Sequence, residues 1–311
     1  MSYEKSKTIL VSGSSGLLGH ELITQLLHNT NYKVIALTSQ TDQLKKQFTD
    51  EKLTVLNINS WFEHVDKNQV DVFINCAFPR SSKPDELAQG LEFTEDIVNK
   101  AISGGIKGII NISSQSVYSQ KEKDRTDEKA EISPESLYGM AKYASERIIA
   151  SLCEKENINY SNIRLASLTG LDFDVRMTNR FVKMAIDGET ITINGGDQLI
   201  SYLEVRDAAE ALIKMLEVDE CEWEKQYNLG NNNSFSLKEL IEIIKSTGNK
   251  YGINNIEVIY KEGNSNFNNL VVSDLFYQEF NWKPKYSVKE MVEELFKKII
   301  NSKSKQGDLY V

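Results

Sequence analysis

The chain has 311 residues, of which 40% are hydrophobic and 26% charged, as expected for a globular protein with a sizeable core. Its net charge of −9 and the lack of a long Lys/Arg run argue against nucleic acid or an anionic membrane as the main partner. The three cysteines form no CxxC pair and the three histidines have no partner at metal-ligand spacing, so no metal site is expected. No apolar run approaches the roughly 20 residues that span a bilayer, and no signal-peptide core is present, which predicts a cytoplasmic protein.

A glycine-rich turn follows the first predicted strand, residues 8–12. It reads GSSGLLG and continues into a helical pattern that ends near Asn29. Backbone N–H groups in such a turn, together with the dipole of the following helix, favour a bound pyrophosphate. The spacing therefore predicts a dinucleotide site rather than a plain tight turn. The expected cofactor contacts in this turn are Gly13, Ser15, Gly16, Leu17, Leu18 and Gly19.

The end of the second predicted strand, residues 33–37, bears on the choice of cofactor. NAD-binding sheets of this type usually place Asp or Glu there to hold the ribose hydroxyls. This chain has Thr38 and Ser39 instead, so no carboxylate repels a 2′-phosphate and Ser39 can donate to one. The pattern favours NADP, with NAD as the alternative. Further cofactor contacts are expected at the ends of the third and fourth strands: Asn57, Ile58, Cys76 and Ala77.

Strands and helices alternate through residues 1–167, which predicts a parallel sheet with helices on both faces. Strands are expected at 8–12, 33–37, 53–58, 70–76, 108–113 and 160–165, and helical segments at 20–29, 61–67, 85–103 and 137–156. Residues 119–134 are charged and polar, which predicts an exposed loop.

Residues 168–311 show a different pattern of short elements and loops rich in Gly and Asn. This predicts a smaller C-terminal α/β substrate lobe, with some of its strands and helices returning to the dinucleotide-binding domain. The expected fold class is α/β, a Rossmann-type doubly wound parallel sheet, and the tail 302–311 should fray. Helices are expected at 179–187, 205–216, 236–245 and 287–299, and strands at 190–193, 199–203, 226–229 and 257–260.

The segment SLYGMAKYASER places Tyr138 and Lys142 four residues apart in a helical pattern, so both lie on one helix face. A nearby ammonium favours a phenolate, so Lys142 should lower the pKa of Tyr138 and fit it for proton transfer. By itself such a pair is typical of an exposed helix surface, and the surrounding motifs give it functional weight.

Taken together, these motifs resemble the extended short-chain dehydrogenase/reductase superfamily, and more closely its NAD(P)-dependent epimerase/dehydratase branch, which acts mainly on nucleotide-linked sugars. The similarity rests on the GxxGxxG turn, the serine-rich strand end SSQSVY and the YxxxK pair, and it extends to RLASLTG, YLEVRDAAEA, YNLG and NWKP. The resemblance implies that Tyr138 is the general acid/base and that Lys142 binds the nicotinamide ribose. It also implies that Ser114 hydrogen-bonds the reacting oxygen and that the chain forms a homodimer through helices 85–103 and 137–156.

The chain departs from the family pattern at several positions. Dehydratases of this kind carry an acidic pair after the catalytic Ser/Thr, whereas this chain has Gln115 and Ser116, so 4,6-dehydration is not expected. A substrate-binding asparagine is replaced by Ser167, and an arginine that grips the diphosphate is replaced by Ile200. Asp207 is expected to be a structural carboxylate at a helix start. The candidate substrate contacts are Ser114, Ser167, Arg176, Asn179 and Arg180.

These observations predict an NAD(P)-dependent epimerase or 4-keto reductase of a nucleotide-linked sugar, active in cell-surface polysaccharide synthesis. A reductase or dehydrogenase of a non-nucleotide carbonyl or alcohol is the alternative, motivated by Ser167 and Ile200. A non-catalytic dinucleotide sensor is the third reading, although such proteins typically lose the tyrosine or the lysine that this chain keeps.

Overall fold

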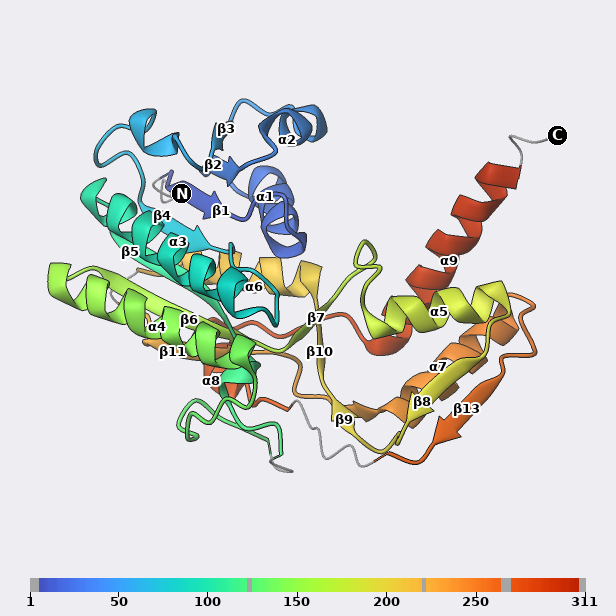
Figure 1. Cartoon of the computed structure of the whole chain (residues 1–311). Helices are drawn as coiled ribbons and strands as arrows, with labels where there is room; N and C mark the ends of the chain where they lie inside the picture. The colour runs from blue at the N-terminus through green and yellow to red at the C-terminus, as the bar shows by residue number, and fades with distance from the viewer. Residues whose placement is uncertain (1–5, 122–124, 220–221, 264–269, 308–311) are drawn as a thin grey trace.

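A seven-stranded parallel sheet forms the larger of the two lobes in the computed structural model, which describes residues 6–121, 125–219, 222–263 and 270–307 (Figure 1). The spatial order of the strands is β11-β6-β5-β4-β1-β2-β3. The order reverses between β1 and β4, and ligands in open α/β sheets bind at such a switch point. The strands are β1 (Thr8–Ser12), β2 (Lys33–Thr38), β3 (Leu53–Asn57), β4 (Val72–Asn75), β5 (Gly108–Ser114), β6 (Asn159–Leu165) and β11 (Gln226–Leu229).

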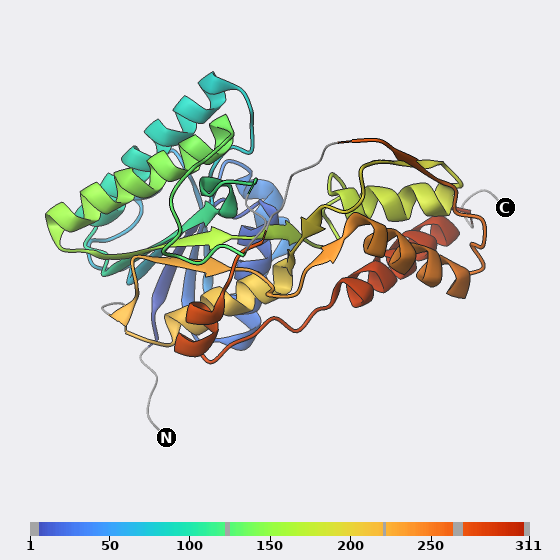
Figure 2. The same ribbon diagram turned by 90° about the horizontal axis from the view of Figure 1, so that it is seen from below.

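Helices cover both faces of this sheet because its strands carry apolar side chains on both sides. In β1, Ile9 and Val11 join the core on one face, whereas Leu10 joins the core on the other. The first face is covered by α1 (Leu17–Asn29) and α6 (Val205–Leu216), with α2 (Thr41–Gln47) and α8 (Asp274–Glu279) at its ends. The second face is covered by α3 (Pro84–Ser103) and α4 (Leu137–Glu156), which lie side by side (Figures 1 and 2). The sheet, the paired helices and the return of α6 and β11 agree with the predicted Rossmann-type architecture.

The smaller lobe has its own apolar core, formed by three helices and a two-stranded parallel sheet. Its elements are α5 (Met177–Asp187), α7 (Leu237–Lys250), α9 (Val288–Gly307), β8 (Ile191–Asn194) and β13 (Val258–Lys261). Two short strand pairs occupy the junction between the lobes: β7 (Ser167–Thr169) with β10 (Tyr202–Glu204), and β9 (Leu199–Ile200) with β12 (Phe235–Ser236) (Figure 1).

Three sequence predictions about local structure are wrong. The expected strand 199–203 is two strands, because Ser201 leaves the ladder and its hydroxyl donates to the carbonyl of Asn231. The expected helix 61–67 is a single 3-10 turn, η1 (Trp61–Glu63), and the chain then turns through Asn68, whose φ is +61°. The tail, expected to fray over 302–311, is helical through Gly307, and the side chain of Lys303 pairs with Asp187 of α5; residues 308–311 lie outside the described residues.

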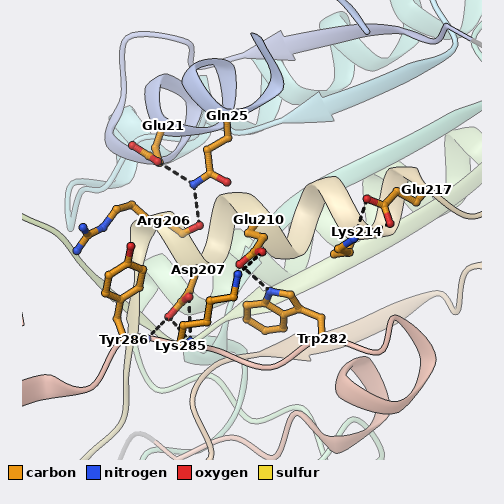
Figure 3. A network of polar contacts seen from close by, with 10 residues as sticks. All are labelled: Glu21, Gln25, Arg206, Asp207, Glu210, Lys214, Glu217, Trp282, Lys285 and Tyr286. Atoms are coloured by element: carbon orange, nitrogen blue, oxygen red, sulfur yellow. Dashed lines mark hydrogen bonds and ion pairs between the residues drawn. The ribbon is translucent and has the colours of Figure 1, made fainter. Parts of the chain in front are cut away.

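A polar network attaches the segment before α9 to the larger lobe (Figure 3). Asp207, in the first turn of α6, accepts hydrogen bonds of 3.0–3.1 Å from the backbone N–H groups of Lys285 and Tyr286. On the other side of α6, Gln25 of α1 donates to the carbonyl oxygen of Arg206 at 2.9 Å. Asp207 is fully buried and its carboxylate binds the backbone of a distant segment, which makes it a structural carboxylate at the start of α6.

Candidate active site

The glycine turn between β1 and α1 is closely packed against the backbone that follows β4. Gly13 adopts φ +67°, and a Cβ atom there would lie 2.9 Å from the backbone nitrogen of Ala77. A Cβ atom at Gly19 would lie 2.3 Å from the carbonyl oxygen of Gly13. Gly16 caps α1 without a side-chain hydrogen bond, which leaves the amides of the first helical turn available to a ligand. The turn therefore fits the pyrophosphate of a dinucleotide.

The carboxyl ends of β2 and β3 lie beside this turn and present the predicted adenosine-side residues. Thr38 is buried, and its hydroxyl lies 2.5 Å from that of Ser15 in the glycine turn. Ser39 is exposed directly after the strand. Asn57 pairs with Thr38 in the β2–β3 register, and the amide of Ile58 donates to the Thr38 carbonyl at 3.1 Å. These four residues form one continuous edge next to the turn.

Ser114, Tyr138 and Lys142 line one cavity of about 450 Å³ at the same sheet edge, together with Cys76 and Leu17. Ser114 is the last residue of β5 and caps the short 3-10 helix η2 (Gln115–Val117). Tyr138 lies in the first turn of α4, whose N-cap Ser136 accepts a hydrogen bond from Gly139 N at 3.0 Å. The Ser114 hydroxyl interacts with the Tyr138 phenol, an interaction that favours the phenolate. The structure thus brings together the three residues expected to be catalytic.

The electrostatics of Tyr138 differ from the sequence prediction. Burial raises the pKa of Tyr138 above its usual value, and the influences that oppose this rise come from Arg80, Ser114 and Arg176. Lys142 does not contribute to the opposing influence. The expectation that Lys142 lowers the pKa of Tyr138 in the unliganded chain is therefore wrong. The physical reason is that desolvation of the phenol outweighs its charged neighbours, and these neighbours are arginines.

Lys142 is buried, and its ammonium is held by the protein backbone. Its Nζ atom donates to the carbonyl oxygen of Ile112 at 2.5 Å and lies 4.3 Å from the centroid of the Phe78 ring. Burial lowers the pKa of Lys142 from 10.5 to about 8, against the opposing influence of Glu146. A lysine held in this way is a compact donor in the cavity wall, suited to a ribose hydroxyl.

Next to the catalytic residues, a buried ion pair connects α4 to the sheet. Arg164 of β6 binds Glu146 through two hydrogen bonds, of 3.0 Å and 2.8 Å. The same carboxylate accepts a hydrogen bond of 2.5 Å from Ser113, the neighbour of Ser114. Arg164 also donates to the hydroxyl of Tyr118 at 2.8 Å. Glu146 lies one helical turn after Lys142, so this network fixes the position of α4 relative to the end of β5.

Two arginines of the cavity wall lie close to Tyr138, and one of them was not predicted from the sequence. Arg80 follows β4, and Arg176 precedes α5. Their guanidinium carbons lie 5.5 Å and 5.0 Å from the centroid of the Phe173 ring. The sequence gives no indication of this role for Arg80, because its contact with Phe173 joins segments that are far apart in the chain.

Gln115 and Ser167 form a polar part of the same cavity wall. The Gln115 amide nitrogen donates to the Ser167 hydroxyl at 3.2 Å. The Gln115 carbonyl oxygen is buried and has no hydrogen-bond partner within the described chain. This oxygen is therefore available to a hydroxyl group of a bound molecule.

Asn179 and Arg180, the other two expected substrate contacts, lie outside the cavity lining. Asn179 is buried and donates to the carbonyl of Gly170 at 3.0 Å. Arg180 is exposed on α5. Asn179 therefore has a structural position and Arg180 a surface position. Only the N-terminal end of α5, at Met177, lines the cavity.

Cys76 lines the cavity, but its chemistry is that of a buried thiol. Burial raises the pKa of Cys76 to about 12, against the opposing influence of Lys142. The thiolate needed for nucleophilic attack is therefore scarce near neutral pH. Across the described ranges, no group of three His, Cys, Asp or Glu side chains is placed to hold a metal ion. Nor is any helix in those ranges both long enough and apolar enough to cross a membrane.

A doubly wound sheet, a glycine turn at its switch point and a Ser/Tyr/Lys set at the same edge define an NAD(P)-dependent enzyme of the extended short-chain dehydrogenase type. Residues 9–230 match the model of the NAD dependent epimerase/dehydratase family, and the chain belongs to this family.

Individual relatives are distant but similar over almost their full length. The chain is 25% identical to a Methanocaldococcus jannaschii protein assigned as a UDP-glucose 4-epimerase, covering 92% of this chain and 96% of the relative. It is 23% identical to the dTDP-4-dehydro-6-deoxyglucose reductase of Escherichia coli, covering 94% and 97%. Its fold is similar to that of the UDP-N-acetylglucosamine 4-epimerase of Bacillus cereus, with a TM-score of 0.78, 22% identity and coverage of 94% and 96%.

Proposed function

We propose that this protein is an epimerase or 4-keto reductase of a nucleotide-linked sugar, with Tyr138 as the proton donor and acceptor and a role in cell-surface polysaccharide synthesis. The observation that carries the proposal is the convergence of Ser114, Tyr138 and Lys142 in one cavity beside the glycine turn. The relatives named as a UDP-glucose 4-epimerase and a dTDP-sugar reductase support the substrate class.

The protein side of the mechanism follows from the geometry. When bound beside this site, a nicotinamide cofactor would supply or accept the hydride. Ser114 and the Tyr138 phenol are positioned to hydrogen-bond one substrate oxygen, and Tyr138 exchanges a proton with it. Lys142, whose ammonium is held by the Ile112 carbonyl, would hold the nicotinamide ribose through a hydrogen bond to one of its hydroxyls. Gln115 and Ser116 provide no acid/base group, so a second proton transfer at a neighbouring carbon is not part of the reaction.

The decisive variant is Tyr138→Phe, assayed with UDP- and dTDP-sugars. It removes only the hydroxyl and keeps the edge contact between this ring and Phe78, whose centroids are 6.4 Å apart. Turnover should fall by a factor of about 10²–10⁴ while cofactor affinity is kept. Full turnover in this variant contradicts the proposal. The two reactions differ in cofactor use, since a reductase consumes the reduced cofactor and an epimerase returns it while forming a new sugar epimer.

The cavity also supports a second candidate, a reductase or dehydrogenase of a non-nucleotide carbonyl or alcohol. Ile200 lines the cavity at the position where the family arginine grips a diphosphate. A site that lacks this contact should bind free UDP, dTDP and GDP weakly. Calorimetric titration of the cofactor-loaded protein with these nucleotides tests the point, because tight binding of any one of them excludes the second candidate.

NADP is the proposed cofactor, with NAD as the alternative. Thr38 and Ser39 place hydroxyls, and no carboxylate, at the end of β2. Separate titrations with NADH and NADPH decide between the two, and tighter binding of NADH contradicts the preference for NADP.

The proposed assembly is a homodimer through α3 and α4. The two helices lie side by side on the outer face of the larger lobe (Figure 2), and α4 exposes about half of the Leu137 and Met140 side chains. Light scattering should give about twice the chain mass of 35.3 kDa. A mass of one chain at micromolar concentration contradicts the dimer.

A further inference from the structure

Arg80 and Arg176 form a pair of cations without a carboxylate partner. Within the described ranges, neither guanidinium makes an ion pair with Asp or Glu, although 45 acidic residues occur in the chain. Several lysines of the described chain, by contrast, do have an acidic partner, as Lys83 has in Glu86 and Lys100 in Asp96. Two like charges that share one aromatic ring and lack a carboxylate repel each other, and an anion between them relieves that repulsion.

Burial leaves part of the Arg176 guanidinium without a hydrogen-bond partner in the described chain. Its Nε atom is buried without a hydrogen-bond partner. Burial and the charge of Arg80 lower the pKa of Arg176 to about 10. A buried donor without a partner costs free energy that a bound acceptor recovers. The planar guanidinium is suited to carboxylate or phosphate, which it binds through two parallel hydrogen bonds.

The two arginines lie close to Tyr138, the residue proposed to exchange a proton with the substrate. Both arginines line the cavity that contains Ser114 and Tyr138, and both act electrostatically on the Tyr138 phenol. Phe173 positions them, because its ring carries one guanidinium at 5.5 Å and the other at 5.0 Å. A group bound between the arginines therefore lies at the catalytic end of the cavity. With a net charge of −9, the chain attracts an anion here only through local cations.

We propose that Arg80 and Arg176 bind a carboxylate or phosphate group carried by the reacting part of the substrate, separate from any nucleotide diphosphate. The inference rests on the proposed function, since it names the class of sugar or carbonyl compound that the Tyr138 site accepts. An acidic substrate is selected because a neutral one leaves the two guanidinium groups without an acceptor.

The test compares ligands that differ only in the anionic group. UDP-glucuronate, UDP-glucose, free glucuronate and inorganic phosphate are titrated calorimetrically into the cofactor-loaded wild type. The same titrations are made with Arg80→Gln, Arg176→Gln and the conservative Arg176→Lys. Lys183→Gln is the matched control, because it removes one positive charge from the exposed surface of the same helix, α5.

The expected result is at least a tenfold loss of affinity for UDP-glucuronate in each Arg→Gln variant, with an unchanged affinity for UDP-glucose. Arg176→Lys should retain part of the affinity, and Lys183→Gln all of it. If only inorganic phosphate shows this dependence on both arginines, the group is a phosphate. Equal losses with UDP-glucuronate and UDP-glucose assign the arginines to the diphosphate and overturn the proposal.

Failure of this proposal is distinguishable from failure of the proposed function. If free glucuronate or phosphate binds through the arginines but no nucleotide sugar binds, the anion site stands and the nucleotide-sugar function fails. If neutral nucleotide sugars are turned over and no anionic probe depends on either arginine, the function stands and the anion site fails.

Discussion

Arg164 binds Glu146 through two hydrogen bonds, and both side chains are about 95% buried between the sheet and α4. Within this pair, Glu146 lies one helical turn after Lys142 and accepts a hydrogen bond from Ser113, the neighbour of Ser114. Its position explains how residues from β5 and α4 keep a common geometry, because the carboxylate contacts both elements at once.

Arg164→Met should destabilise the fold by about 3–5 kcal/mol, because it leaves the Glu146 carboxylate buried without its cation. Urea denaturation measures the change. Arg147→Met, one position after Glu146 on the exposed side of α4, is the control and should stay within about 0.5 kcal/mol of wild type. Equal stabilities of the two variants contradict the structural role of the pair.

Lys142 makes stability depend on pH in the cofactor-free protein. Its pKa is about 8 in the folded chain and 10.5 in the reference state. Below pH 8 both states bind the proton, and between pH 8 and 10.5 only the unfolded chain binds it. The free energy of unfolding should therefore rise with pH across this window, by at most about 3.4 kcal/mol.

The difference between wild type and Lys142→Met isolates this contribution, because other titrating groups cancel. Wild type should gain stability relative to the variant between pH 7.5 and pH 9.5 in urea unfolding. Lys183→Met, which removes an exposed lysine, should follow wild type at both values. A constant difference between wild type and Lys142→Met contradicts the lowered pKa.

Gly19→Ala should weaken cofactor binding at least tenfold. The added Cβ would lie 2.3 Å from the carbonyl oxygen of Gly13, which forces the glycine turn to open. Gly188→Ala is the control: Gly188 has φ +72° and open space around its Cβ position, so alanine costs about 1 kcal/mol of stability there without reaching the turn. Fluorescence titration with NADPH and NADH measures both, and unchanged affinity in Gly19→Ala would falsify the assignment of the turn.

Ser39→Asp should reverse the proposed cofactor preference. A carboxylate at this exposed position after β2 repels a 2′-phosphate and can accept hydrogen bonds from ribose hydroxyls. Affinity for NADPH should fall at least tenfold while that for NADH is kept. Ser39→Asn has nearly the same shape without the charge and should lose much less. An unchanged ratio of the two affinities in Ser39→Asp places the 2′ position elsewhere.

Local patterns in the sequence determined the strands of the main sheet, the glycine turn and the pairing of Tyr138 with Lys142. These features depend on spacing within one strand or helix, where periodicity and backbone geometry act over a few residues. The catalytic set was also accessible, because Ser114 ends a strand and parallel strands bring their carboxyl ends to one edge.

Only the tertiary structure decided the charges around Tyr138. Arg80 and Arg176 both approach the Phe173 ring although they are 96 positions apart in the chain, and the Lys142 ammonium donates to the carbonyl of Ile112. The sequence alone suggested that Lys142 lowers the pKa of Tyr138, whereas burial raises it. Desolvation and long-range charge depend on which segments fold over the phenol, and no spacing along the helix encodes that.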